Sequence, residues 1–295
     1  MKKRRRNNKK KRVMLLVIIV VCALLVIRIN LKKESTKKTI ANNNNETKQI
    51  SNEQTNQNQE ENVEDNLLDQ KLKTGKKLSE NGLPVLMYHF FYDKSKDSGK
   101  DANWIEISNF DEQMKYLAEN DFYFPTWEQV ENYIEEKQEL PEKSVVITVD
   151  DGDPSFFELA VPIIQKYKIP VTSFVITYWY GNRANDKQKY VDYQSHSYDM
   201  HKAGKNGKGV MLSWDYDKIK DDILLSREVL GGATIFCYPF GQYNDLDIKV
   251  LKENGYKLAF TTKGGRVKKG GSKYELPRVR ISGNTSMLEF KKKVE

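Results

Sequence analysis

The feature that most constrains the fold is an alternation of short apolar runs with helical stretches, beginning near Gly82. Apolar runs predict strands at 83–88, 144–149, 171–176, 234–238, 258–262 and 276–281. Helical spacing, capping residues or glycine stops predict helices around 110–117, 126–137, 154–167, 215–230 and 244–254. Strands that alternate with helices predict a parallel α/β sheet or barrel. We therefore expect one α/β domain at 81–295, since about 210 residues suffice for such a fold.

The N-terminal part of the chain has the pattern of a membrane anchor. Residues 1–12 contain nine basic residues and no acidic one, and residues 13–27 are apolar without a charge. A spanning helix needs about 20 residues, and basic side chains at its ends can reach the interface. We expect a cytoplasmic basic tail at 1–12 and a transmembrane signal-anchor at 13–30, with the C-terminal domain extracellular. A cleaved signal peptide starts similarly, but no small-residue cleavage site follows the run.

Composition also limits the remaining chain and its partners. Residues 31–80 are rich in Asn, Gln, Glu and Lys and poor in large apolar residues, which predicts a disordered polar linker. Subtracting the nine basic residues of the tail from the net charge of +8 leaves −1, so a nucleic-acid-binding face is not expected. The two cysteines, Cys22 and Cys237, lie in different segments, which excludes an intrachain disulfide framework. No protein partner is indicated.

Scarce reactive side chains follow the predicted strands or lie in the polar stretch 181–209. In chain order they are His89, the pair Asp150 and Asp151, His196, His201 and the segment Tyr238–Gly241. Reactive groups of α/β barrels cluster at the carboxyl ends of the strands. This agreement predicts an enzyme.

The residue types suit a divalent metal ion. Two histidines and one carboxylate can bind Zn²⁺ with positions left for water and substrate, or Fe(II) as in facial-triad oxygenases. The second carboxylate favours hydrolysis, because that reaction needs a base beside the metal. Taken alone, Asp-Asp-Gly is more typical of a turn, and a lone histidine is more often structural.

Several motifs together resemble one known family. T-V-D-D-G at 148–152 is similar to the T-F-D-D-G motif of the polysaccharide deacetylases, which are carbohydrate esterase family 4 with NodB homology. H-S-Y-D-M-H at 196–201 resembles the second motif, with an extra residue between the histidines as in the poly-N-acetylglucosamine deacetylase branch. V-L-M-Y-H at 85–89 and Y-P-F-G at 238–241 resemble that branch too. The resemblance covers roughly residues 83–285 and implies a distorted (β/α) barrel.

The resemblance also implies roles. Asp150 is the expected general base, and His89 is the expected general acid. The expected metal ligands are Asp151, His196 and His201, which would bind one divalent ion; zinc is favoured, with cobalt, nickel or iron as alternatives. Two departures stand out: Cys237 replaces the usual Arg before the third motif, and no histidine follows His201.

Oxyanion and substrate contacts are expected from two further segments. The backbone N–H of Phe240 would stabilise the oxyanion, within the segment Tyr238, Pro239, Phe240 and Gly241. Tyr178, Trp179 and Tyr180 would stack against sugar rings, although most aromatic residues of any domain pack in its core.

The expected activity is metal-dependent removal of N-acetyl groups from an extracellular N-acetylglucosamine polysaccharide, with release of acetate. Poly-N-acetylglucosamine is favoured over peptidoglycan. The two departures motivate one alternative, a non-catalytic or weakly catalytic glycan-binding module. The other alternative is a facial-triad Fe(II) oxygenase, which leaves Asp150 without a role.

Overall fold

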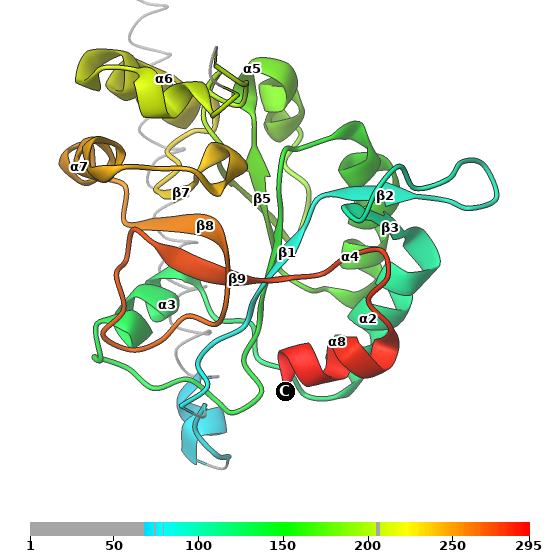
Figure 1. Cartoon of the computed structure of the whole chain (residues 1–295). Coiled ribbons are helices and arrows are strands. Elements are labelled where there is room, and N and C mark those ends of the chain that lie inside the picture. The colour runs from blue at the N-terminus through cyan, green and yellow to red at the C-terminus, as the bar shows by residue number, and fades with distance from the viewer. Residues whose placement is uncertain (1–67, 74, 79, 205–206) are drawn as a thin grey trace, which may run out of the picture. The chain divides into compact units, whose positions relative to one another are not determined.

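In the computed structural model, seven parallel strands of the described part of the chain close into a barrel whose strand order follows the sequence (Figure 1). The structure describes residues 68–73, 75–78, 80–204 and 207–295. The barrel strands are β1 (Val85–Tyr88), β4 (Val146–Val149), β5 (Val171–Val175), β6 (Val191–Ser195), β7 (Ile235–Cys237), β8 (Leu258–Gly264) and β9 (Leu276–Arg280). Leu86 of β1 pairs with both Ile147 and Val279, which closes the ring. The predicted parallel α/β barrel is therefore confirmed.

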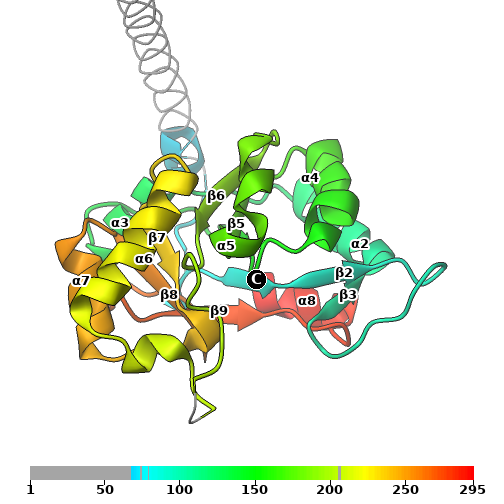
Figure 2. The same cartoon turned by 90° about the horizontal axis from the view of Figure 1, so that it is seen from above.

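Helices surround the barrel on two sides. Figure 2 shows α6 (Tyr216–Val229) and α7 (Asp245–Glu253) on one side, with α2 (Ile107–Glu119) and α4 (Val161–Tyr167) on the other. The remaining elements are α3 (Trp127–Ile134), α5 (Thr177–Tyr180), α8 (Met287–Val294), a π-helical turn η1 (Phe156–Ala160), the 3₁₀ turns η2 (Gly181–Asn185), η3 (Val210–Ser213) and η4 (Pro239–Gly241), and a separate strand pair, β2 (Phe90–Tyr92) and β3 (Trp104–Glu106). The predicted capping box of Thr126 and Gln129 begins α3.

Alternation along the strands divides the core into layers. One set of positions, which includes Val146, Cys237 and Phe260, packs in the barrel interior together with residues of α3. The intervening positions pack outward, beneath α2, α4 and α8 or beneath α6 and α7. Successive side chains of a strand point to opposite faces, so each position in a strand fixes which layer its side chain enters.

Several elements differ from the prediction. The polar stretch 181–209 contains β6, which pairs with β5 along its whole length. β6 lacks an apolar run because its polar groups are bonded: Gln194 Oε1 accepts from the N–H groups of Thr234 and Ile235. The β2–β3 pair and α8 were also not predicted, although Ser286 and Glu289 form a capping box that begins α8.

The predicted tail and anchor, and most of the predicted linker, lie outside the described residues. Among those that are described, none of the helices has the length and apolar character needed to span a membrane. The end of the segment that we placed in the linker contacts the barrel domain. Leu68 is buried, and Lys77 forms a β-bridge with Pro141.

Candidate active site

The structure brings the predicted metal-binding and catalytic residues together at the carboxyl ends of the strands. His89 directly follows β1, Asp150 and Asp151 follow β4, and His196 follows β6. The sequence did not reveal β6, so the placement of His196 at a strand end is a finding of the structure. His201 lies five residues after His196, and the loop between them brings both side chains to Asp151.

Asp151, His196 and His201 form a set that fits a divalent cation. Asp151 Oδ1 lies 3.4 Å from His196 Nε2 and 3.5 Å from His201 Nε2. Potential ligand atoms of the three residues all lie within 4.8 Å of one another. Asp151 Oδ1 is buried and has no hydrogen-bond donor among the described residues. A buried oxygen normally has a partner, so this orphaned atom between two imidazoles is consistent with a cation site.

The hydrogen bonds of His196 support the same conclusion. Its Nδ1–H donates to the Cys237 carbonyl over 2.7 Å, a contact that fixes the ring and leaves Nε2 to face Asp151. Burial, followed by a charge on His196, lowers the pKa of His201 to about 4, so its imidazole is neutral near pH 7. Burial alone would lower the pKa of His196, but Cys237 and Asp151 outweigh it and raise that pKa, so His196 would release its proton on binding a cation. Neutral imidazole is the form that binds metal.

Three left-handed residues shape the loops of the site. Asp151, Ser197 and Phe240 have φ angles of 75°, 74° and 59°, although none of them is glycine. Each such conformation costs on the order of 1 kcal/mol or more and persists only where the surroundings impose it. The turn at Asp151 separates the two carboxylates: Asp150 stays in register with β1 through its N–H bond to Tyr88, while Asp151 faces the histidines.

Asp150 is held inside the barrel by a guanidinium from β9. Arg278 Nη1 and Nη2 each donate to an Asp150 carboxylate oxygen over 2.7 Å, a bidentate pair with both residues buried. Burial alone would raise the pKa of Asp150, but the charge and hydrogen bonds of Arg278 lower it well below its usual range. Asp150 is therefore ionised near neutral pH.

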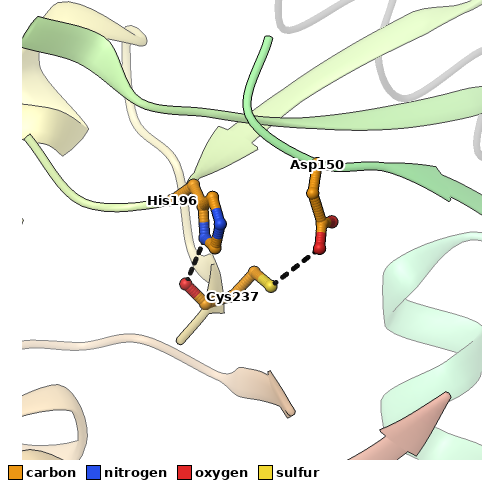
Figure 3. A group of neighbouring side chains, drawn as sticks. All are labelled: Asp150, His196 and Cys237. Carbon is orange, nitrogen blue, oxygen red and sulfur yellow. Dashed lines mark hydrogen bonds between the residues drawn. The ribbon is translucent and has the colours of Figure 1, made fainter. Parts of the chain in front are cut away.

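The thiol of Cys237 completes this buried cluster. Figure 3 shows Cys237 between His196 and Asp150, with Sγ 3.7 Å from Asp150 Oδ2. Arg278 Nη2 lies 3.1 Å from the same sulfur. The small side chain of Cys237 on β7 leaves room for Arg278 of β9. The resemblance led us to expect an arginine at position 237, and the arginine of this cluster comes from β9 instead. Asp150, His196 and Cys237 also lie close enough together to hold a metal ion. The guanidinium of Arg278 already supplies positive charge there, which argues against an ion beside Cys237.

His89 lies at the edge of the cluster. Its Nε2 is 3.7 Å from Asp150 Oδ2, and its side chain is 17% exposed. Burial lowers the pKa of His89, and the negative charge of Asp150 opposes that shift. The position puts His89 within reach of both Asp150 and the solvent-facing mouth, as a general acid requires. Its catalytic role stays a prediction.

The third motif contributes less of its side-chain surface than expected. The buried ring of Tyr238 packs outside the barrel, and its hydroxyl donates to the Tyr274 carbonyl over 3.1 Å. Pro239 is buried as well. Phe240 is 42% exposed, and its ring centroid lies 4.3 Å from that of His201. Gly241 has a φ of 69°, and an added Cβ would lie 2.1 Å from Thr262 Oγ1, so this turn requires glycine. Phe240 is thus the side chain of this motif that borders the site.

The predicted aromatic platform lies on α5. Tyr178 and Trp179 are 59% and 49% exposed, and the Trp179 ring centroid lies 6.4 Å from that of His201. Tyr180 is partly buried and meets Trp179 edge-on. Exposed aromatic side chains beside the histidines are consistent with sugar stacking, which stays a prediction.

Sequence reasoning missed Arg278. The strand L-P-R-V-R places Arg278 two residues after Leu276, and therefore on the same face. A charged side chain sharing the face of an apolar strand residue was the available signal, because buried charges need partners.

Comparison with known proteins agrees with this fold. The family model "polysaccharide deacetylase" matches residues 137–259. A poly-beta-1,6-N-acetyl-D-glucosamine N-deacetylase of Staphylococcus epidermidis is 30% identical over 194 residues, which cover 59% of this chain and 67% of that protein. The Staphylococcus aureus protein of the same name is 29% identical over 237 residues, covering 70% and 81%. The solved structure of the Streptococcus pyogenes deacetylase PplD has a TM-score of 0.62 at 24% identity, covering 75% of this chain and 99% of that one.

A parallel barrel with an Asp-His-His set and a second carboxylate at its mouth defines the class of metal-assisted barrel hydrolases. Within that class, the chain belongs to the polysaccharide deacetylase family.

Proposed function

We propose that this chain removes N-acetyl groups from poly-N-acetylglucosamine, releasing acetate and leaving free amines on the polymer. The observation that carries the proposal is the meeting of Asp150, Asp151, His89, His196 and His201 at one mouth of the barrel. The curated relatives named as N-deacetylases of this polymer support the choice of substrate. Peptidoglycan is the second candidate, because the same acetamide group occurs in it.

Asp151, His196 and His201 are the residues that would hold the divalent ion, zinc before cobalt, nickel or iron. When bound, the ion supplies Lewis acidity that polarises the acetamide carbonyl and makes water a better nucleophile. The Cys237 carbonyl keeps His196 in the tautomer that such binding needs.

Asp150 accepts the proton of the attacking water. Arg278 keeps Asp150 ionised and fixes the orientation of its carboxylate. The hydroxyl of the water joins the acetyl carbon, and the Phe240 N–H stabilises the oxyanion. His89, 3.7 Å from Asp150, delivers a proton to the departing nitrogen as the carbon–nitrogen bond breaks. The products are acetate and an amine, and transfer of the proton held by Asp150 to His89, 3.7 Å away, restores both side chains for the next turnover.

The proposed setting is the outer face of the cell membrane. The basic tail, the apolar run 13–27 and the polar segment after it support a single-pass anchor with the catalytic domain extracellular. From there the domain meets an N-acetylated cell-surface polysaccharide.

Acetate release by the full chain tests the proposal. The chain is stripped of metal, reloaded with Zn²⁺ or Co²⁺, and incubated with β-1,6-linked N-acetylglucosamine oligomers or with peptidoglycan fragments. We expect metal-dependent acetate release, faster from the β-1,6 oligomers. His201→Ala should abolish it together with metal binding, whereas Asp150→Asn should keep the metal and lose at least ~100-fold in turnover.

The outcomes separate the alternatives. Glycan binding without acetate release, with metal supplied, would leave a binding module. Turnover that consumes oxygen would indicate the oxygenase. Faster release from peptidoglycan would change the substrate and keep the reaction.

A further inference from the structure

We propose that Asp222 is a positioning residue that fixes the loop carrying His196 and His201 and thereby sets the affinity of the site for its metal ion. The inference rests on the proposed function in one respect, namely that Asp151, His196 and His201 bind a divalent cation. Asp222 lies on α6 and belongs to none of the sequence motifs.

The contacts of Asp222 are made with the histidine loop itself. The residue is 7% exposed, and each carboxylate oxygen accepts a backbone N–H: Tyr198 N donates to Oδ1 over 2.7 Å, and Asp199 N donates to Oδ2 over 2.8 Å. Both N–H groups lie between the two histidines. Hydrogen bonds from backbone N–H groups to an ionised carboxylate are roughly twice as strong as neutral ones.

The neighbouring N–H groups of the loop are satisfied within the loop. Ser197 N donates to Ser195 Oγ over 3.2 Å, and Met200 N donates to Ser197 Oγ over 3.1 Å. Residues 197–200 thus present four consecutive N–H donors. The loop's own serine hydroxyls accept from the first and the last, and Asp222 accepts from the two in the middle. A buried N–H group left unpaired is costly, so the loop conformation depends on this carboxylate.

A second contact joins the same helix to the start of the loop. Ser226 lies one turn after Asp222, and its Oγ is 2.7 Å from Ser195 Oγ. The other side of the loop is bonded to the start of α5, where Thr177 N and Tyr178 N donate to the carbonyls of Ser197 and Tyr198. The loop is thus clamped between two helices.

The clamp matters because the loop is strained and carries two ligands. Ser197 has a φ of 74°, a conformation that a serine rarely adopts without external constraint. The spacing of the histidines is also one residue longer than the usual pattern of the family. If the middle of the loop relaxes, His196 and His201 change their separation, and the site loses its fit to the ion.

The test compares Asp222→Asn with a matched control, Asp247→Asn, in the full chain. Asp247 is also a buried carboxylate that accepts a backbone N–H, from Asn244 over 2.8 Å, but it caps α7 and lies on no ligand loop. An asparagine at 222 can accept only one of the two bonds, since its NH₂ would face a donor. Three quantities are measured: Zn²⁺ dissociation by competition with a chelator, the absorption spectrum of the Co²⁺-loaded chain, and the thermal midpoint.

We expect Asp222→Asn to weaken Zn²⁺ binding about 10-fold or more and to alter the Co²⁺ spectrum. Asp247→Asn removes a negative charge from the first turn of α7 and should lower the thermal midpoint, while its Zn²⁺ affinity stays within about 2-fold of that of the unmodified chain. Unchanged Zn²⁺ affinity and Co²⁺ spectrum in Asp222→Asn would overturn the inference. Equal losses of Zn²⁺ affinity in the two variants would also overturn it, because the role of Asp222 would then be general stability.

If Asp222→Asn does not fold, Ser226→Ala decides. It removes only the contact to Ser195 and should weaken Zn²⁺ binding about 3-fold, whereas affinity equal to that of the unmodified chain would reject the clamp. Failure of the unmodified chain to bind any divalent ion would overturn the proposed function and this inference together. Binding by the unmodified chain with equal affinity in the variants would overturn this inference alone.

Discussion

The two adjacent carboxylates differ because their surroundings differ. Asp150 meets a buried guanidinium, whereas Asp151 faces two imidazole nitrogens and has an oxygen without a hydrogen-bond donor among the described residues. The first is kept ionised and oriented, and the second is left free to bind a cation. One strand end thus offers one carboxylate suited to act as a base and another suited to bind a cation, two functions that a single environment could not support.

Arg278→Met tests the buried pair. Removing the guanidinium leaves Asp150 as a buried charge without its partner, which should cost about 3–5 kcal/mol in the free energy of unfolding. Arg280→Met is the control on the same strand: its contact with Asn103 is exposed, so the change should stay within about 0.5 kcal/mol. Urea unfolding measures both. Adding Asp150→Asn to Arg278→Met should recover part of the loss, and the absence of any recovery would argue against the ion pair as its cause.

The same variant has a pH signature. In the unmodified chain the pKa of Asp150 is depressed, so its contribution to stability is present above the unfolded value of about 4 and is lost only as pH falls below it. In Arg278→Met, burial raises the pKa of Asp150, and the base becomes protonated at higher pH. We expect the acid limb of kcat/KM to move upward in the variant. An unmoved limb would indicate that another group is the base.

His89→Ala tests the general acid. An amine must be protonated as it leaves, whereas an activated ester needs little help. We expect the variant to keep its metal and to lose most amide cleavage, with much less effect on an activated ester. Parallel kinetics on the two substrates measure the difference, and equal losses would make His89 a structural residue.

At the scale of elements, turns after β4, β6 and β7 lead the chain into the site. The turn η4 after β7 has two consecutive left-handed residues, Phe240 and Gly241. It holds the Phe240 ring against His201. A change in this turn should therefore affect both the packing on β8 and the wall of the site.

Gly241→Ala is expected to destabilise the chain by about 2 kcal/mol or more, because the new Cβ would overlap Thr262 in a conformation already unfavourable for alanine. Gly231→Ala is the matched control. Gly231 has a φ of 73° with nothing within 4 Å of an added Cβ, so only the conformational cost of about 1 kcal/mol applies. Thermal unfolding of the two variants separates the steric overlap with Thr262 from backbone strain. Equal decreases in thermal midpoint would show that the overlap contributes nothing.

The sequence was enough to predict the strands that are apolar and the helices that carry capping signals. Sequence reasoning missed β6 because the strand satisfies its polar residues through bonds to other elements, such as Gln194 with the N–H of Ile235. It singled out the candidate metal ligands because few histidines and paired acids were available, and their role as ligands stays a prediction. It could not foresee Arg278 or Asp222, since their partners come from distant parts of the chain and only the closed barrel shows which faces meet.

At the scale of the whole molecule, the segment proposed to anchor the chain and the residues of the candidate site lie in different parts of the sequence. The apolar run 13–27 is proposed to anchor the chain, whereas the residues of the site all lie between 89 and 278. A deletion of residues 1–30 should therefore move the protein from the membrane fraction to the soluble fraction. Its rate of acetate release from short soluble oligomers should stay unchanged, and release from cell-bound polymer should fall. Membrane fractionation with acetate assays checks this, and a membrane-bound deletion variant would reject the anchor.

The pairing of Asp150 with Arg278 also has a consequence for how the protein is made. The base lies at the end of β4, but its cationic partner arrives on β9, the last strand of the barrel, after all the other barrel strands have left the ribosome. A nascent or truncated chain that ends before residue 276 holds the expected metal ligands, yet its base has no counter-charge. Because β9 also closes the barrel against β1, we expect a chain that lacks it to release no acetate.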